Sequence, residues 1–125
     1  MMKHAVAIVV GLTLLASVGA ALAQKMTEQF IPIGQSPGLS GVHTRIGTVD
    51  SFSSQEAMLT LSDGSASYSV QIAEDTHIWL DKSKLGSTNE VGTAADLQSG
   101  RRLEVKYQDN DPDAPAEWIK VEVTE

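Results

Sequence analysis

A four-residue segment, Ser62-Asp63-Gly64-Ser65, separates two stretches in which apolar and polar residues alternate. The apolar positions recur at every second residue in both stretches: Ala57, Leu59 and Leu61 before the segment, and Ala66, Tyr68, Val70 and Ile72 after it. Asp-Gly between two such stretches is a strong hairpin signal, because a type I′ turn needs positive φ at both central residues. The sequence therefore predicts a β-hairpin over residues 57–72 with a type I′ turn.

The same period of two continues on both sides of this hairpin and predicts further strands with one buried face. One strand begins at Gly41, with Gly47 marking a bend or bulge. Two more cover residues 101–107 and 116–125. Residues 76–81 alternate again after the interruption Ala73-Glu74-Asp75, and they are either the continuation of a bent third strand or a short separate strand.

A short helix is expected over residues 93–100. Thr93 is placed as an N-cap with Asp96 three residues later, Gly100 supplies the stop, and Leu97 anchors the helix in the core. Three strands, a short helix and two strands follow the order of a small five-stranded OB-like Greek-key barrel, an all-β fold. Half of a β-sandwich and an open meander are the alternatives.

The core and turn positions also resemble a group of small secreted bacterial domains of uncharacterised function with an OB-like fold. The resemblance lies in Gly47-x-Val49-Asp50, Leu59-x-Leu61-x-Asp63-Gly64, Val70 with Asp75-Thr76-x-Ile78, Asp96-Leu97-x-x-Gly100, and Ile119 with Val121. It covers most of residues 45–123, supports the architecture, and implies no catalytic residues.

The amino terminus has the pattern of a secretory signal peptide over residues 1–23. Lys3 precedes an apolar stretch that ends in Ala21-Leu22-Ala23, a cleavage-site pattern. An uncleaved membrane anchor is the alternative, because the stretch approaches the length of a spanning helix. We therefore expect a periplasmic or secreted protein, with no stable membrane insertion after cleavage. The chain has no cysteine, which excludes disulfides and a lipidated cysteine.

An extended arm is expected over residues 24–40, ahead of a barrel domain over residues 41–125. Proline and glycine exclude a helix in the arm, and its apolar residues are expected to pack on the barrel or, as the alternative, on a partner. These residues are Phe30, Ile31, Ile33 and Leu39.

Composition limits the partners. The chain has nine Lys and Arg against 16 Asp and Glu, a formal net charge of −7. Nucleic acids and anionic membranes both favour clustered cations, so neither is an expected partner.

Catalytic and metal-binding patterns are weak. Beyond the signal segment the only histidines are His43 and His77, and no nucleophile motif occurs. Asp109, Asp111 and Asp113 alternate like the first ligands of an EF-hand loop, but Ala114 and Lys120 occupy the positions that need Gly and Glu. We expect no enzyme activity, no cofactor and no metal site, and an ordinary acidic turn at these aspartates.

The candidate ligand-binding residues are Trp79, Trp118 and His77. Both tryptophans fall on the strand side opposite the aliphatic positions, so they are either exposed binding platforms or lids that pack against the barrel end or the arm. OB-folds bind ligands beside the loops after strands one and four, here Ser51 to Gln55 and Gln108 to Pro115. The function expected is a non-enzymatic envelope domain that binds a protein or small polar ligand; the alternative is a structural or stress-related protein that docks on a larger assembly through its arm.

Overall fold

The computed structural model describes residues 27–125, so the expected signal segment and the first residues of the expected arm lie outside the described residues. The described chain is mainly β and forms one mixed seven-stranded sheet in the order β3-β2-β1-β6-β7-β4-β5. The strands are β1 (Thr44–Ser53), β2 (Met58–Ser62), β3 (Ser67–Gln71), β4 (His77–Asp81), β5 (Glu90–Val91), β6 (Arg102–Tyr107) and β7 (Ala116–Glu122). Three single 3-10 turns accompany them: η1 (Ser83–Leu85), η2 (Ala94–Asp96) and η3 (Gln108–Asn110).

The predicted five-stranded closed barrel is wrong in two respects, since the sheet has seven strands and does not close. Residues 77–81 form a separate strand, β4, because a turn interrupts the alternation after Ile72. In that turn Ala73 N–H donates to Thr76 Oγ1, and the Thr76 hydroxyl donates to the carbonyl of Ala116. β3 and β4 therefore lie at different places in the sheet, and β5 extends it beyond β4.

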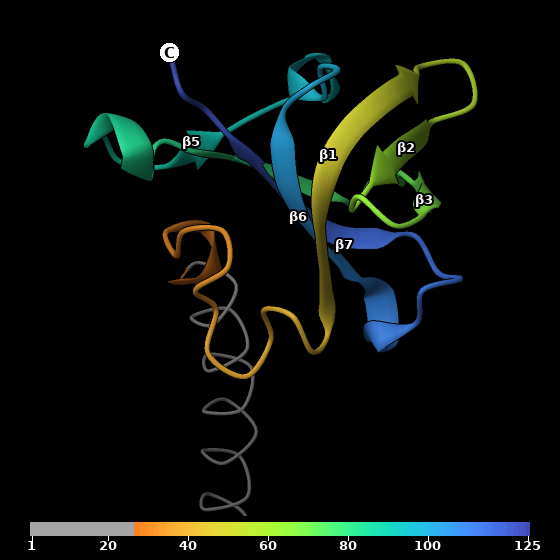
Figure 1. Cartoon of the computed structure of the whole chain (residues 1–125), viewed down its shortest axis with the longest axis horizontal. Helices are drawn as coiled ribbons and strands as arrows, with labels where there is room; N and C mark the ends of the chain where they lie inside the picture. The colour runs from red at the N-terminus through yellow and green to blue at the C-terminus, as the bar shows by residue number, and fades with distance from the viewer. Residues whose placement is uncertain (1–26) are drawn as a thin grey trace, which may run out of the picture.

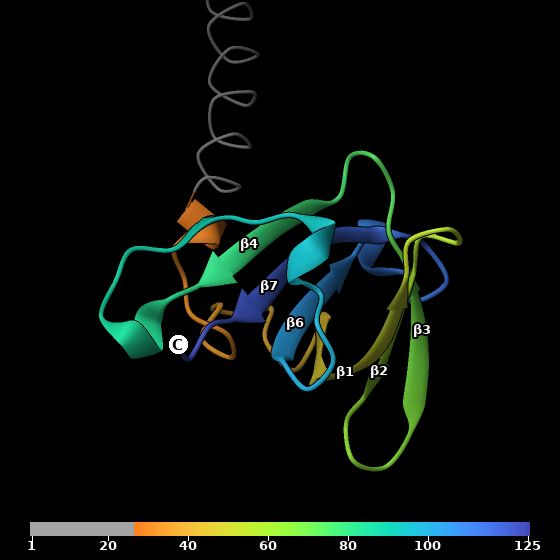
Figure 2. The ribbon, with the colours of Figure 1, turned by 90° about the horizontal axis from the view of Figure 1, so that it is seen from above.

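One pairing in this sheet is parallel, that of β4 with β7, and all the others are antiparallel. The strong twist turns the β1–β2–β3 end across the β6–β7–β4 end (Figure 1, Figure 2). Both ends bury their aliphatic residues in one core, whose main members are Val49, Leu59, Leu61, Val70, Ile78, Leu97, Leu103, Val105, Tyr107, Ile119 and Val121.

The hairpin of β2 and β3 is confirmed, but its turn is not type I′. Asp63 and Ala66 are joined by a backbone hydrogen bond of 3.2 Å, and only Gly64 has positive φ, at 94°. Oδ1 of Asp63 accepts hydrogen bonds from the N–H groups of Ser65 and Ala66. Asp63 itself does not have positive φ, and its side chain closes the turn through these two hydrogen bonds.

The short helix between residues 93 and 100 is confirmed as the single turn η2. Thr93 and Asp96 form the predicted capping box, in which Thr93 N–H donates to Asp96 Oδ2 at 2.8 Å. Leu97 is 4 % exposed and belongs to the core, and Gly100 has φ 90°.

Gly47 lies where β1 packs tightly against β2. A Cβ atom there would lie 2.6 Å from Leu61 Cδ1 and 2.7 Å from the carbonyl oxygen of Ser62. The pairing of β1 with β2 then shifts register between Val49 and Ser51, the bulge that the mid-strand glycine predicts. No helix in residues 27–125 is long and apolar enough to cross a membrane.

Candidate functional site

The structure brings the three predicted site residues together on neighbouring strands. His77 and Trp79 lie on β4, and Trp118 lies opposite His77 on β7. The rings of His77 and Trp79 are stacked with centroids 5.6 Å apart, and the rings of Trp79 and Trp118 are 5.8 Å apart. The three rings form a row on the sheet face that points away from the main core.

The two tryptophans are buried. Trp79 is 4 % exposed and Trp118 is 2 % exposed, so neither is an open platform for a ligand, and the packed alternative holds. His77, in contrast, is exposed. The tryptophans are therefore packing residues of this face, and His77 is the one of the three predicted site residues that is exposed to solvent.

The arm covers this face through buried polar contacts. Nζ of Lys120, on β7, is fully buried, donates to Glu28 Oε1 at 2.7 Å and to Ser36 Oγ at 3.0 Å, and lies 4.5 Å from the centre of the Trp118 ring. The apolar side chains of the arm contribute less to this contact. Ile33 is buried, but Phe30 is 51 % exposed. The arm packs on its own sheet, the first of the two alternatives, but charge and hydrogen bonding carry much of the contact. Its predicted extended form is wrong in the described part, where residues 27–29 are helical and residues 37–43 form turns.

Two acidic side chains complete the attachment of the arm. Glu104, on β6, is fully buried and accepts hydrogen bonds from Gly34 N–H and from the hydroxyls of Ser40 and Thr44. Asp81, on β4, accepts a 2.9 Å hydrogen bond from Ile33 N–H.

The carboxyl group of Asp81 stays ionised in this setting. Burial acts to raise its pKa, but hydrogen bonds from Ile33 N–H and from Ser83, together with the charge of Lys120, outweigh burial and hold that pKa below its ordinary value. Alternation alone placed Asp81, Glu104 and Lys120 on the polar side of their strands, which normally faces water. Their burial could not be found from that signal, because it depends on where the arm lies.

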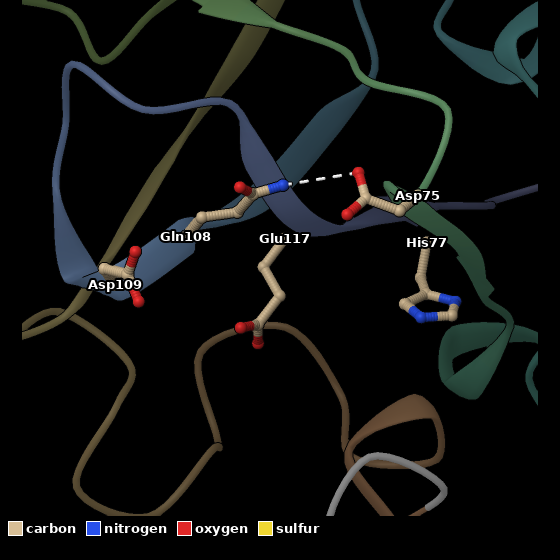
Figure 3. A pocket seen from close by; sticks show the side chains of 5 residues that line it. All are labelled: Asp75, His77, Gln108, Asp109 and Glu117. Carbon is tan, nitrogen blue, oxygen red and sulfur yellow. Dashed lines mark hydrogen bonds between the residues drawn. The ribbon is translucent and has the colours of Figure 1, made fainter.

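A separate acidic hollow opens at the start of β4. Its volume is about 280 Å³, and five residues line it: Asp75, His77, Gln108, Asp109 and Glu117. They come from the turn before β4, from β4 itself, from η3 and from β7, as Figure 3 shows. The Gln108 amide donates to Asp75 Oδ1 at 3.3 Å and so spans the hollow (Figure 3).

The turn at η3 sets the position of Asp109. Asp109 and Asn110 both have φ near 54°, and Asp111 N–H donates back to the carbonyl of Gln108. Asp111 Oδ1 accepts a hydrogen bond from Asp113 N–H, a turn within the loop. Among residues 27–125, no group of three or more His, Cys, Asp or Glu side chains is arranged to hold a metal ion.

The hollow has an excess of negative charge. It brings three carboxylates together, and of these Glu117 forms an ion pair with Lys106 at 3.3 Å. Such a site attracts an organic cation or a basic side chain, which can donate hydrogen bonds to carboxylate and amide oxygens together. The sequence pointed to His77 and to the loop from Gln108, but not to Asp75 or Glu117; only the parallel pairing of β4 with β7 brings these four together.

Comparisons with known protein families, with characterised proteins and with solved structures found no match to this chain. The resemblance to secreted OB-like domains thus stays a prediction.

A second and wider hollow, of about 550 Å³, lies at the other predicted binding loop. It is lined by Asp50, Ser51, Phe52, Ser54, Ala94, Ala95, Leu97 and Ser99. Its lining carries one carboxylate and mostly small side chains. The two predicted loops therefore border two different hollows, and the acidic one has the more distinctive chemistry.

Proposed function

We propose that this protein is a non-enzymatic binding domain of the bacterial envelope that recognises a cationic group on a protein or small polar ligand. The observation that carries the proposal is the acidic hollow, where three carboxylates, His77 and the Gln108 amide converge from four segments. Electrostatic attraction between such a hollow and a basic group raises both the association rate and the selectivity for cations.

An OB-like chain path is part of the proposal. β1, β2 and β3 form a meander, β6 and β7 follow on the other side of β1, and β4 returns parallel to β7. If β3 and β4 are taken as two halves of one strand, this order supports an OB-like arrangement, which is a partly open barrel. The loop after its fourth strand then contributes Gln108 and Asp109 to the hollow.

Export to the periplasm or the medium is the cellular setting that we propose. Its support is the signal-peptide pattern of residues 1–23, which lie outside the described residues. The alternative role, docking on a larger assembly through the arm, has less support. The arm residues Glu28, Ile33 and Ser36 already bond to β4 and β7 of the same chain.

The test is a titration of the protein with agmatine, a small organic cation, followed by NMR at His77 and the Gln108 side-chain amide. We expect saturable shifts at these two residues and an affinity about tenfold lower in Glu117→Gln, because the loss of one close charge costs about 1.4 kcal/mol. Glu56→Gln is the matched control, since Glu56 is exposed and lies outside the hollow.

Equal weakening in the two variants, or shifts spread evenly over all acidic residues, would show that agmatine senses only the net charge. Either result contradicts the proposal.

A further inference from the structure

The free edge of β3 has the features of a strand-addition site. β3 is the last strand at one end of the sheet, and among residues 27–125 it pairs with β2 alone. Backbone hydrogen bonds join Ala57 to Ile72 and Asp63 to Ala66. Because hydrogen-bonded pairs alternate along an antiparallel ladder, Tyr68 and Val70 also bond to β2.

The residues between them point the other way. Ser67, Ser69 and Gln71 direct their N–H and C=O groups away from β2, and all three are exposed. Within residues 27–125, no hydrogen bond reaches these backbone groups from another element. Three residues thus offer a row of unpaired donors and acceptors.

This edge lacks the usual protection. Natural sheets shield an edge strand with charges, proline, a bulge or extreme shortness. β3 carries none of these: its sequence is Ser-Tyr-Ser-Val-Gln, and its register with β2 is unbroken. The opposite edge of the sheet, β5, follows the rule, since it has two residues and one of them is Glu90.

Charges at both ends of β3 select the kind of partner. Asp63 lies before the strand, where hydrogen bonds from Ser65 lower its pKa to about 2, and Glu74 and Asp75 lie after it. If a second copy paired antiparallel about Ser69, Asp63 of each copy would face Asp75 of the other. Like charges placed opposite each other destabilise a strand pair, so a second copy is disfavoured.

We propose that the free edge of β3 binds an extended segment of a partner protein by strand addition, with Lys or Arg at the ends of that segment. The main-chain groups of Ser67, Ser69 and Gln71 supply the hydrogen bonds, and Asp63 and Glu74 face the basic ends. The inference rests on the proposed function in one respect, the cationic character of the partner, but it assigns a different surface.

The test uses a synthetic peptide of alternating Thr and Val with two lysines at each end, and a matched peptide with glutamates at the ends. We expect slower amide exchange at Ser67, Ser69 and Gln71 in the presence of the lysine peptide, and binding at least tenfold weaker for the glutamate peptide. Ser69→Pro removes one outward N–H at an edge where proline is tolerated, and it should weaken binding about tenfold. Ser69→Ala is the matched control, because it changes the side chain and keeps the N–H group.

Three results would overturn the proposal: unchanged exchange at saturating peptide, equal binding by Ser69→Pro and Ser69→Ala, or protection that rises with protein concentration in the absence of peptide. The last result would identify a second copy as the occupant. Glu117→Gln separates this surface from the hollow, since it should weaken agmatine binding and leave peptide-induced protection of β3 unchanged. Failure of one proposal is therefore visible without failure of the other.

Discussion

Nζ of Lys120 lies 2.7 Å from Oε1 of Glu28, which joins the last strand to the arm across most of the chain length. The Lys120 side chain has no exposed surface, and that of Glu28 is 13 % exposed. A cation so completely removed from water is tolerated only when it is paired and hydrogen-bonded, here by Glu28 and Ser36. The arm is thus part of the fold and not an accessory to it.

Replacing Lys120 by Met is expected to lower the free energy of unfolding by about 3 kcal/mol, because Glu28 is left without its cation in a nearly dry site. The double variant Glu28→Gln with Lys120→Met should recover part of this loss, since the unpaired charge is gone. Urea unfolding measures both. Lys84→Met, which removes an exposed partner of Glu122, is the control and should cost less than about 1 kcal/mol. A Lys120→Met midpoint equal to that of the control would contradict a structural role for the pair.

Glu104→Gln is expected to loosen the arm. The carboxylate accepts hydrogen bonds from Gly34 N–H, Ser40 and Thr44, and an amide offers only one oxygen for them. The loss should be about 1–3 kcal/mol, with faster hydrogen exchange at the Gly34 amide. Glu56→Gln, at an exposed loop position, should leave that exchange rate unchanged. Exchange at Gly34 as slow as in the native protein would refute the assignment.

Gly47→Ala is expected to destabilise the protein by about 1–3 kcal/mol, because the added Cβ meets the backbone carbonyl of Ser62 as well as a Leu61 methyl group. The backbone of β2 cannot move aside without loss of its ladder with β1. Thermal unfolding provides the measurement. The neighbouring change Thr48→Ala, at an exposed position of the same strand, serves as the reference and should have little effect. Equal melting temperatures would mean that β1 and β2 separate without cost.

The hairpin turn is expected to contribute to acid sensitivity. Hydrogen bonds from Ser65, then from Ala66, lower the pKa of Asp63 from 3.8 to about 2. Because folding lowers this pKa, the ionised carboxylate stabilises the folded protein at any pH above the pKa of the unfolded chain, 3.8. This contribution is lost as the pH falls from 3.8 through about 2. Asp63→Asn should flatten the dependence of the urea midpoint on pH in this window. Asp81, whose pKa is also lowered, should supply part of the remaining slope. An unchanged slope in Asp63→Asn would contradict the role of the turn.

Sequence patterns correctly predicted the elements that are stabilised by interactions between residues close in sequence. The hairpin over residues 57–72, the capping box of Thr93 with Asp96 and the bulge near Gly47 each depend on residues close in sequence. The type I′ turn was wrong because the Asp63 carboxylate offered the turn N–H groups a better set of acceptors. The strand count was wrong for two reasons. Thr76 bonds to Ala73 and to Ala116 and so separates β4 from β3, and the two residues of β5 pair with β4.

Alternation along the chain was enough to predict β-strands with one aliphatic face, because only an extended strand places every second side chain on the same side. Whether the opposite, polar face is buried or exposed depends on the tertiary structure. Alternation assigns Lys120, Glu104 and Asp81 to water, but the arm lies over them, so that all three are buried and hydrogen-bonded to arm residues. The tertiary structure likewise decided that Asp75, His77 and Glu117 share one hollow. Both outcomes depend on contacts between segments far apart in the chain, which short-range periodicity does not encode.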